Sequence, residues 1–549
     1  MQWHQDYFAV NGSVFLTALC AAIPMFFLFW ALAIKRMRGH IATFLTLVLT
    51  MLVAMIVFKM PIITTLSATA FGAANGILPL CWLIFFAVFL YNLIIKSGNF
   101  EIIKSSIATV SNDRRIQAIL IGFCFSAFLE GTTAQGAPVA IAAAMLIGLG
   151  FPVLPAAIIC LVGNTVPVPF GPVGMPTITM ANVSGIDAGI VTASVGGVMC
   201  FYALIIPVFM LVVMSGWKAT KEVLPVCLVA SITYIIPNWI VTQYMGPALP
   251  SLLPPLISLV CTIVFLKFWK PVTIWRFEND APLEQLGQTT YQKRMTLYAW
   301  TPFILVTAFM VVWSTQAFKA FSKSLGIIIQ MPGGWPGLNG VVYKTVPIVA
   351  SPEIYKAAFA FDMFAAIGTA LLIVAVITMF LFKMKASTFV QVFKETFRQL
   401  KFAMVTIICV LSIAHLSNYA GVTFTMGLAF AATGSMFMVF SPFIGFVGTF
   451  LTGSVTSSSA LFGNLQRVTA MQLELNPLIT VTASMVGAVM GKLISPQSIA
   501  IATAATGLVG REGEILSKTA KYAFILLGIG IFIMLILTYL MPWYFPFVK

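Results

Sequence analysis

The stretch "AFLEGTTAQGAPVAIAAAMLIGLG", residues 127–150, places a polar cluster inside an apolar run that otherwise is typical of a membrane helix. It begins with the carboxylate of Glu130 beside Gly131. A charge at the bilayer centre costs roughly 2.5–3.5 kcal/mol on insertion scales, so such a group is normally functional or paired. Glycine permits tight turns, and non-helical backbone at membrane depth needs a cover of protein or an aqueous cavity. The stretch therefore predicts a break inside the membrane.

The rest of the chain has the composition of a membrane protein. Of its 549 residues, 60% are hydrophobic and 8% are charged, against roughly 25% charged in soluble proteins. Apolar runs of about 20 residues recur, each long enough to cross about 30 Å of hydrocarbon. We expect an all-α polytopic membrane protein with about 12 spans and no soluble domain. The predicted spans lie near 13–34, 41–58, 63–95, 153–180, 189–214, 223–243, 249–269, 297–316, 359–382, 402–436, 477–510 and 520–545.

The basic residues predict the topology. Most of the 30 Lys and Arg residues, which give a net charge of +15, fall at 35–38, 96–115, 215–222, 267–296, 383–401 and 511–521. Cytoplasmic loops carry such an excess, so the charge does not call for a nucleic-acid partner. All six regions share one side if segments 116–150 and 441–472 do not cross the membrane. We therefore expect both to be re-entrant hairpins, with both chain termini outside.

The two hairpin segments resemble each other. "FLEGTTAQGA" at 128–137 matches "FLTGSVTSSSA" at 450–460, and "GPVGMP" at 171–176 matches "GKLISP" at 491–496. Inverted repeats with broken helices are the usual architecture of secondary transporters. Close helix packing also favours small residues, but it does not explain four clusters at matched positions.

From these matches we predict an inverted-repeat transporter with two re-entrant hairpins and two broken helices. The division has a first repeat at 1–215 (hairpin 116–150, broken helix 153–180), connecting spans at 216–316, and a second repeat at 317–549 (hairpin 441–472, broken helix 477–510).

Polar side chains at the hairpin tips and breaks are the candidate substrate contacts. Helix halves that meet at a break point their N–H ends inward, where the partial positive charge favours an anion. Lys492 suits an anionic substrate or a counter-charge to Glu130. The candidates are Thr132, Thr133, Gln135, Asn164, Thr165, Ser457, Ser458, Ser459, Lys492, Ser495 and Gln497.

Two titratable residues are candidates for proton coupling. Glu130 is the one carboxylate within an intramembrane motif, although it could instead cap a helix. His415 is the one histidine inside a predicted span, and histidine titrates near physiological pH. A lone buried histidine is more often a satisfied core residue.

We interpret Asp362 as a helix N-cap. The eight cysteines lie in apolar segments without a CxxC pair and read as core residues, so no metal or cofactor is expected.

With these motifs in hand, the chain resembles the bacterial lactate/glycolate permease family nearly end to end. The likeness is strongest in "FLEG" and "GAPVAI" (128–141), "NTVPVPFGPVGMP" (164–176), "SPFIGFVGTFLTGSVTSSSALFGNLQ" (441–466) and "GKLISPQSIAIATAATGLVGRE" (491–512). The resemblance implies electroneutral uptake of small 2-hydroxymonocarboxylates such as lactate and glycolate with protons, a multi-pass location in the inner membrane, and no cofactor.

Three positions depart from the family pattern. The family usually has an acidic residue where Val455 stands and Asn where Ser459 stands, and its Gly-Phe-Gly is Ala134-Gln135-Gly136 here. An apolar residue in place of an acid removes a candidate proton or cation site. His415 is one residue that could compensate.

Other function classes stay open at this point. The alternatives are a carrier for another small organic anion, a sodium-coupled carrier, a membrane-embedded enzyme and a channel. No intramembrane Ser/His or paired-Asp constellation favours an enzyme, and symmetric hairpins suit alternating access better than a continuous pore. Expected partners are the organic anion, the proton and membrane lipid, with a homodimer as a further option.

Overall fold

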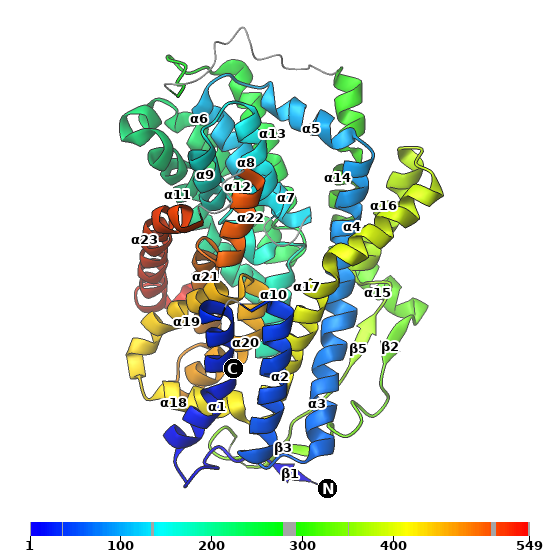
Figure 1. Ribbon diagram of the computed structural model, residues 1–549, viewed down its shortest axis with the longest axis vertical. Coiled ribbons are helices and arrows are strands. Elements are labelled where there is room, and N and C mark those ends of the chain that lie inside the picture. Colours follow the sequence, from blue (N-terminus) through cyan, green and yellow to red (C-terminus); the bar gives the residue numbers. More distant parts are fainter. Residues whose placement is uncertain are drawn as a thin grey trace.

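The structure is a computed structural model that describes residues 2–35, 37–132, 137–277, 292–349, 351–506 and 512–546. It is built mainly of helices (Figure 1). Ten described helices are long and apolar enough to cross a membrane, or eleven with one bent pair. Three other predicted spans, 153–180, 249–269 and 359–382, contain apolar helices of 10–17 residues.

The first part of the chain contributes η1, the start of α2 and one residue of α4 to the lining of the candidate site. A π-helical stretch joins α3 to α4, and together they run along most of the molecule's length in Figure 1. Pro79 lies in that stretch, where its missing N–H disfavours regular α-helix. The elements are α1 (Val14–Phe29), η1 (Trp30–Ile34), α2 (Gly39–Ile56), α3 (Ile62–Asn75), η2 (Gly76–Cys81), α4 (Trp82–Lys96) and α5 (Asn99–Ala108).

The segment predicted as the first hairpin begins with a continuous helix, Arg114–Thr132, which is one of the ten long apolar helices. It is divided into α6 (Arg114–Gln117), η3 (Ala118–Phe125) and α7 (Ser126–Thr132). The shorter helices that follow it are α8 (Ala137–Gly148), α9 (Val153–Gly163), η4 (Val168–Phe170) and α10 (Met175–Ser184). The break predicted within 163–176 is present between α9 and α10. Prolines at 167, 169 and 172 explain it, because each lacks a backbone donor.

The middle of the chain is a run of longer helices followed by two small sheets. The helices are α11 (Ala188–Glu222), α12 (Leu224–Tyr244), α13 (Leu253–Phe268), α14 (Lys293–Ser314) and α15 (Gln316–Leu325). The strands are β1 (Trp3–His4), β2 (Ile328–Gln330), β3 (Val342–Lys344), β4 (Glu353–Ile354) and β5 (Ala360–Asp362), paired in the orders β1-β3-β4 and β2-β5. These sheets are an addition to the all-α prediction.

The last part of the chain combines two long helices, α17 and α23, with shorter ones. Its elements are α16 (Ile367–Leu381), α17 (Ala386–Ala420), α18 (Val422–Ala431), η6 (Gly434–Met436), α19 (Phe437–Thr452), α20 (Val455–Gln472), α21 (Pro477–Lys492), α22 (Pro496–Thr506), α23 (Glu512–Tyr539) and η7 (Pro542–Tyr544). Segment 477–510 is broken between α21 and α22, as predicted.

The loop prediction for 383–401 was wrong, since α17 begins at Ala386. Val392, Thr396 and Leu400 are buried at four-residue spacing, which is the spacing of one helix face. Asn92 of α4 donates a hydrogen bond to the Thr396 hydroxyl over 2.9 Å. The basic residues therefore lie on the outer face of a helix.

Two further boundaries also differ from the prediction. The span expected at 402–436 is interrupted at Gly421, whose φ of 87° ends α17, and the chain bends by 116° after α18. The span expected from 359 begins as strand β5. Asp362 does not cap α16, whose N-cap is Ala366. Its carboxylate instead accepts hydrogen bonds from Ser322 and from the Phe364 and Ala365 amides.

The two predicted repeats interlock through their short helices. Helix α20 packs against α10, and α22 packs against α8, so each candidate hairpin lies against the broken helix of the other repeat. The re-entrant path of the hairpins and the inverted symmetry remain predictions. Their packing nevertheless brings residues near 130, 164, 455 and 492 together.

Candidate functional site

The centre of the candidate site is a buried ion pair between Glu130 and Lys492. The Lys492 Nζ lies 2.6 Å from the Glu130 Oε1, with side-chain exposures of 14% and 6%. Glu130 comes from α7 and Lys492 from the last turn of α21, so the pair joins the two predicted repeats. A cation is favoured at a helix C-terminus. Removing one partner of a buried pair leaves an uncompensated charge, which costs about 3–5 kcal/mol.

A short hydrogen-bond chain engages the second oxygen of Glu130. Asn164, at the C-terminal end of α9, donates from Nδ2 to Glu130 Oε2 over 2.7 Å. The Ser126 hydroxyl donates to Asn164 Oδ1 over 3.2 Å, which fixes the orientation of the amide. Both carboxylate oxygens of Glu130 therefore have a hydrogen-bond donor.

Gly171 allows the break after α9 to lie against this carboxylate. A Cβ at position 171 would stand 2.5 Å from the Glu130 Cγ and 2.7 Å from its carbonyl oxygen. Real Cβ contacts are never this short, so only glycine fits without a shift. The glycine-rich break in the sequence is thus explained by the close packing of backbone on Glu130.

The ion pair borders a cavity of about 980 Å³. One wall holds Glu130, Lys492 and the start of α20, from Ser454 to Ser457. Ser454 caps α20, accepting a hydrogen bond from the Ser457 amide over 3.2 Å. The first-turn N–H groups and the helix dipole make such a helix start favourable for an anion. The other wall comes from η1, the start of α2, and α17.

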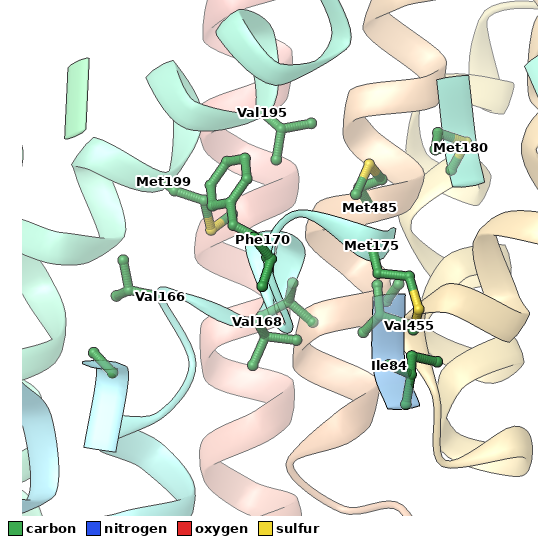
Figure 2. Close-up of a cluster of buried hydrophobic side chains, with 14 of the residues drawn as sticks. Ile84, Val166, Val168, Phe170, Met175, Met180, Val195, Met199, Val455 and Met485 are labelled. Atoms are coloured by element: carbon green, nitrogen blue, oxygen red, sulfur yellow. The ribbon is translucent and has the colours of Figure 1, made fainter. Parts of the chain in front are cut away.

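An apolar cluster lies beside the pair. Figure 2 shows Val455 near Met175 and Ile84, and all three line the cavity. Val455 is buried. The position that the family pattern would fill with an acid is therefore set among apolar side chains here.

The predicted contact residues, taken together with Glu130, divide into four groups. Glu130, Ser457, Lys492 and Gln497 line the cavity, and Asn164 is one hydrogen bond away from it. Others bond elsewhere: Thr132 to Leu129 O, Thr165 to Val162 O, Ser458 to Gly445 O, and Ser495 to Ser498. Ser459 is buried, with no hydrogen-bond partner for its hydroxyl among the described residues. Thr133 and Gln135 lie outside the described residues.

His415 lies apart from the cavity lining. It is buried on α17, with its ring edge-on to Phe71 at a centroid distance of 5.0 Å. Within the described part of the chain its Nε2 has no hydrogen-bond partner. Its role in proton coupling stays a prediction.

Sequence reasoning missed one wall of the cavity. His40, Phe402, Thr406 and Ile407 line it, although they lie in or next to segments that looked like a basic loop and an ordinary span. The sequence feature that could have indicated this wall was His40, at the start of an apolar run. Contact between residues near 40 and near 402 is long-range, so periodicity could not reveal it.

The sequence is similar to known proteins along nearly its whole length. The family model described as L-lactate permease matches residues 17–541. The chain is 40% identical to an L-lactate permease of Escherichia coli strain K12 over 552 residues, covering 99% of this chain and all of that protein. An L-lactate permease of Bacillus subtilis strain 168 is 39% identical over 570 residues, covering all of both chains. The glycolate permease GlcA of Escherichia coli K12 is 41% identical over 542 residues, covering 95% of this chain and 96% of that one.

Among solved structures, the YdaH transporter of Alcanivorax borkumensis aligns with a TM-score of 0.43 and 14% identity, covering 86% of this chain and 88% of that chain. That likeness is too distant to bear on the site. The full-length sequence matches are decisive, and the relatives are named as permeases, which are transporters and not enzymes. The chain is a multi-pass membrane protein and belongs to the L-lactate permease family.

Proposed function

We propose that this protein imports small 2-hydroxymonocarboxylates, such as lactate and glycolate, together with protons across the bacterial inner membrane. The names of its relatives support the substrate class. The observation that carries the proposal is the Glu130–Lys492 ion pair on the wall of the cavity. An anion carrier needs a buried cation, and a proton-coupled carrier needs a buried group that can take a proton.

The pair supplies both through an exchange of partners. A substrate carboxylate displaces Glu130 from Lys492, while a proton binds to the freed Glu130 carboxylate. Lys492 keeps its own proton throughout. Ser457 and Gln497 are further polar side chains in the lining of the cavity. On release, the anion and the proton leave and the ion pair forms again.

This exchange explains why the two species would move together. The empty site is neutral because Glu130 and Lys492 compensate each other, and the loaded site is neutral because the substrate takes the place of Glu130. With only one species bound, an uncompensated charge remains in a buried site. That penalty, about 3–5 kcal/mol for a broken buried pair, disfavours movement of the half-loaded carrier. The transport cycle is thereby electroneutral.

Uptake into proteoliposomes tests the proposal. With the membrane potential clamped, an inward proton gradient should drive accumulation of labelled lactate, and collapse of the gradient by a protonophore should abolish it. Protein-free liposomes provide the control. Accumulation that follows a sodium gradient and ignores pH would favour the sodium-coupled alternative. Uptake of other organic anions in place of lactate and glycolate would reject the substrate class.

A further inference from the structure

A histidine from another part of the fold also lines the cavity that the ion pair borders. His40 lies in the first turn of α2, directly after Gly39, and lines the same cavity as Glu130 and Lys492. These three are the titratable side chains among the described residues of the lining. Glu130 and Lys492 are paired with each other, whereas the His40 imidazole forms no hydrogen bond or ion pair with the residues that the structure describes.

The imidazole is held in position by stacking. Its centroid lies 4.4 Å from that of Phe402 on α17, with 23° between the ring planes. A stacked ring keeps one face covered and leaves its in-plane nitrogens accessible at the edge. Imidazole has at least one N–H donor in either protonation state and is also an acceptor when neutral. It is therefore a hydrogen-bonding group that is oriented by Phe402 and has no hydrogen-bond partner within the described part of the chain.

The two walls come from different parts of the fold. His40 and Phe402 belong to helices α2 and α17, which pack together. Glu130 and Lys492 belong to the short and broken helices. A cavity of about 980 Å³ is far larger than a three-carbon acid requires. Transporters of this general kind work by moving one such group of helices against the other, and closure around a small substrate would bring the walls together.

We propose that His40 is the specificity contact for the 2-hydroxyl group of the substrate in the closed state, while Lys492 holds the carboxylate. The inference rests on the proposed function. A site built to bond a substrate hydroxyl discriminates against the analogue that lacks it, because the polar group of the site is then left unpaired. The relevant analogue is propionate, which is lactate without the hydroxyl.

The test compares lactate and propionate as competitors of labelled lactate uptake by wild type, His40→Phe, His40→Gln and His40→Ala. The Phe variant keeps a ring for stacking but has no donor, and the Gln variant keeps a donor. Leu45→Ala, at a lipid-exposed position on the same helix, is the matched control for general effects on α2. Size-exclusion profiles show which variants are folded.

We expect the Phe and Ala variants to lower the preference for lactate over propionate roughly 3- to 10-fold, the range set by one hydrogen bond. The Gln variant should retain part of it, and Leu45→Ala should match wild type. An unchanged preference in folded His40→Phe would overturn the assignment. If the Phe and Ala variants do not fold, two other results together would overturn the assignment. One is an unchanged preference for lactate over propionate in His40→Gln. The other is an equal shift of the wild-type melting temperature by lactate and by propionate. Wild type that takes up no lactate would overturn the proposed function itself.

Discussion

The two stretches of matched sequence that line the cavity, one in α7 and one at the start of α20, differ in their chemistry. The first, at α7, carries the carboxylate of Glu130 with a donor on each oxygen. The second, at α20, is uncharged: Ser454 caps the helix and apolar Val455 follows. Although the two sequence stretches match, the ionisable chemistry lies on the first, and the second is a neutral, polar helix start suited to an anion.

Lys492 is the partner of Glu130, so the loss of Lys492 should have the largest effect on transport. Lys492→Gln removes both the partner of Glu130 and the cation that receives the substrate. We expect lactate uptake to fall by on the order of 100-fold or more. The reason is that breaking a buried ion pair costs about 3–5 kcal/mol. Both net uptake and lactate exchange across the membrane should be lost.

The stability of the same variant provides an independent check. Lys492→Gln should lower the melting temperature in detergent, and the double variant Glu130→Gln/Lys492→Gln should recover much of that loss because no charge is left unpaired. Additive losses in the double variant would show that the two side chains do not depend on each other.

A second change would make the two tips alike. Val455→Asp places a carboxylate in the cavity wall beside Met175 and Ile84. The family pattern has an acid at this position, but in this chain the position is buried among apolar side chains. A negative charge there would lack compensation and would repel the anionic substrate, so uptake at pH 7.5 should fall about 10-fold, or about 1.4 kcal/mol. Protonation at acidic pH removes the charge, so uptake should recover toward wild type as the pH falls. A matched Val455→Asn variant should show no such recovery. Unaltered uptake of Val455→Asp at pH 7.5 would mean that this helix start does not face the substrate.

The smallest expected effect concerns the packing that supports the first tip. In Gly171→Ala the new methyl group collides with Glu130. Overpacking of this kind costs about 1–3 kcal/mol, which a thermal melt in detergent would register. Gly528→Ala on α23 is the control, since a Cβ there meets nothing within 4 Å. Equal melting temperatures for the two variants would contradict the close approach at Gly171.

Several features of this fold could be predicted because they follow from local chemistry. Charges are costly in apolar segments, so Glu130 and Lys492 were recognisable from the sequence alone. Prolines lack a backbone donor, so the break before α10 was also predictable. A counter-charge to Glu130 was one of two roles that the sequence offered for Lys492, and the structure pairs the two side chains across 362 positions. Local patterns could not decide between the two roles, because they carry no information on contacts at that separation.

The errors have the opposite cause. The start of α17 looked like a loop because its basic residues hid a four-residue spacing of buried ones. The break at Gly421 looked like part of a continuous apolar span. The small sheets and the His40 wall depend on contacts between distant segments, on which local periodicity carries no information.

The most direct test of the ion-pair exchange compares net uptake with exchange in Glu130→Gln. Glutamine is neutral at every pH, so the loaded carrier stays neutral, but the empty carrier retains an unpaired Lys492 and cannot return. Gradient-driven accumulation of lactate in proteoliposomes should therefore be lost, while exchange of labelled for unlabelled lactate should persist. Accumulation equal to wild type in a well-folded Glu130→Gln variant would contradict the account, and the proton would then have to bind elsewhere, with His415 the next residue to test.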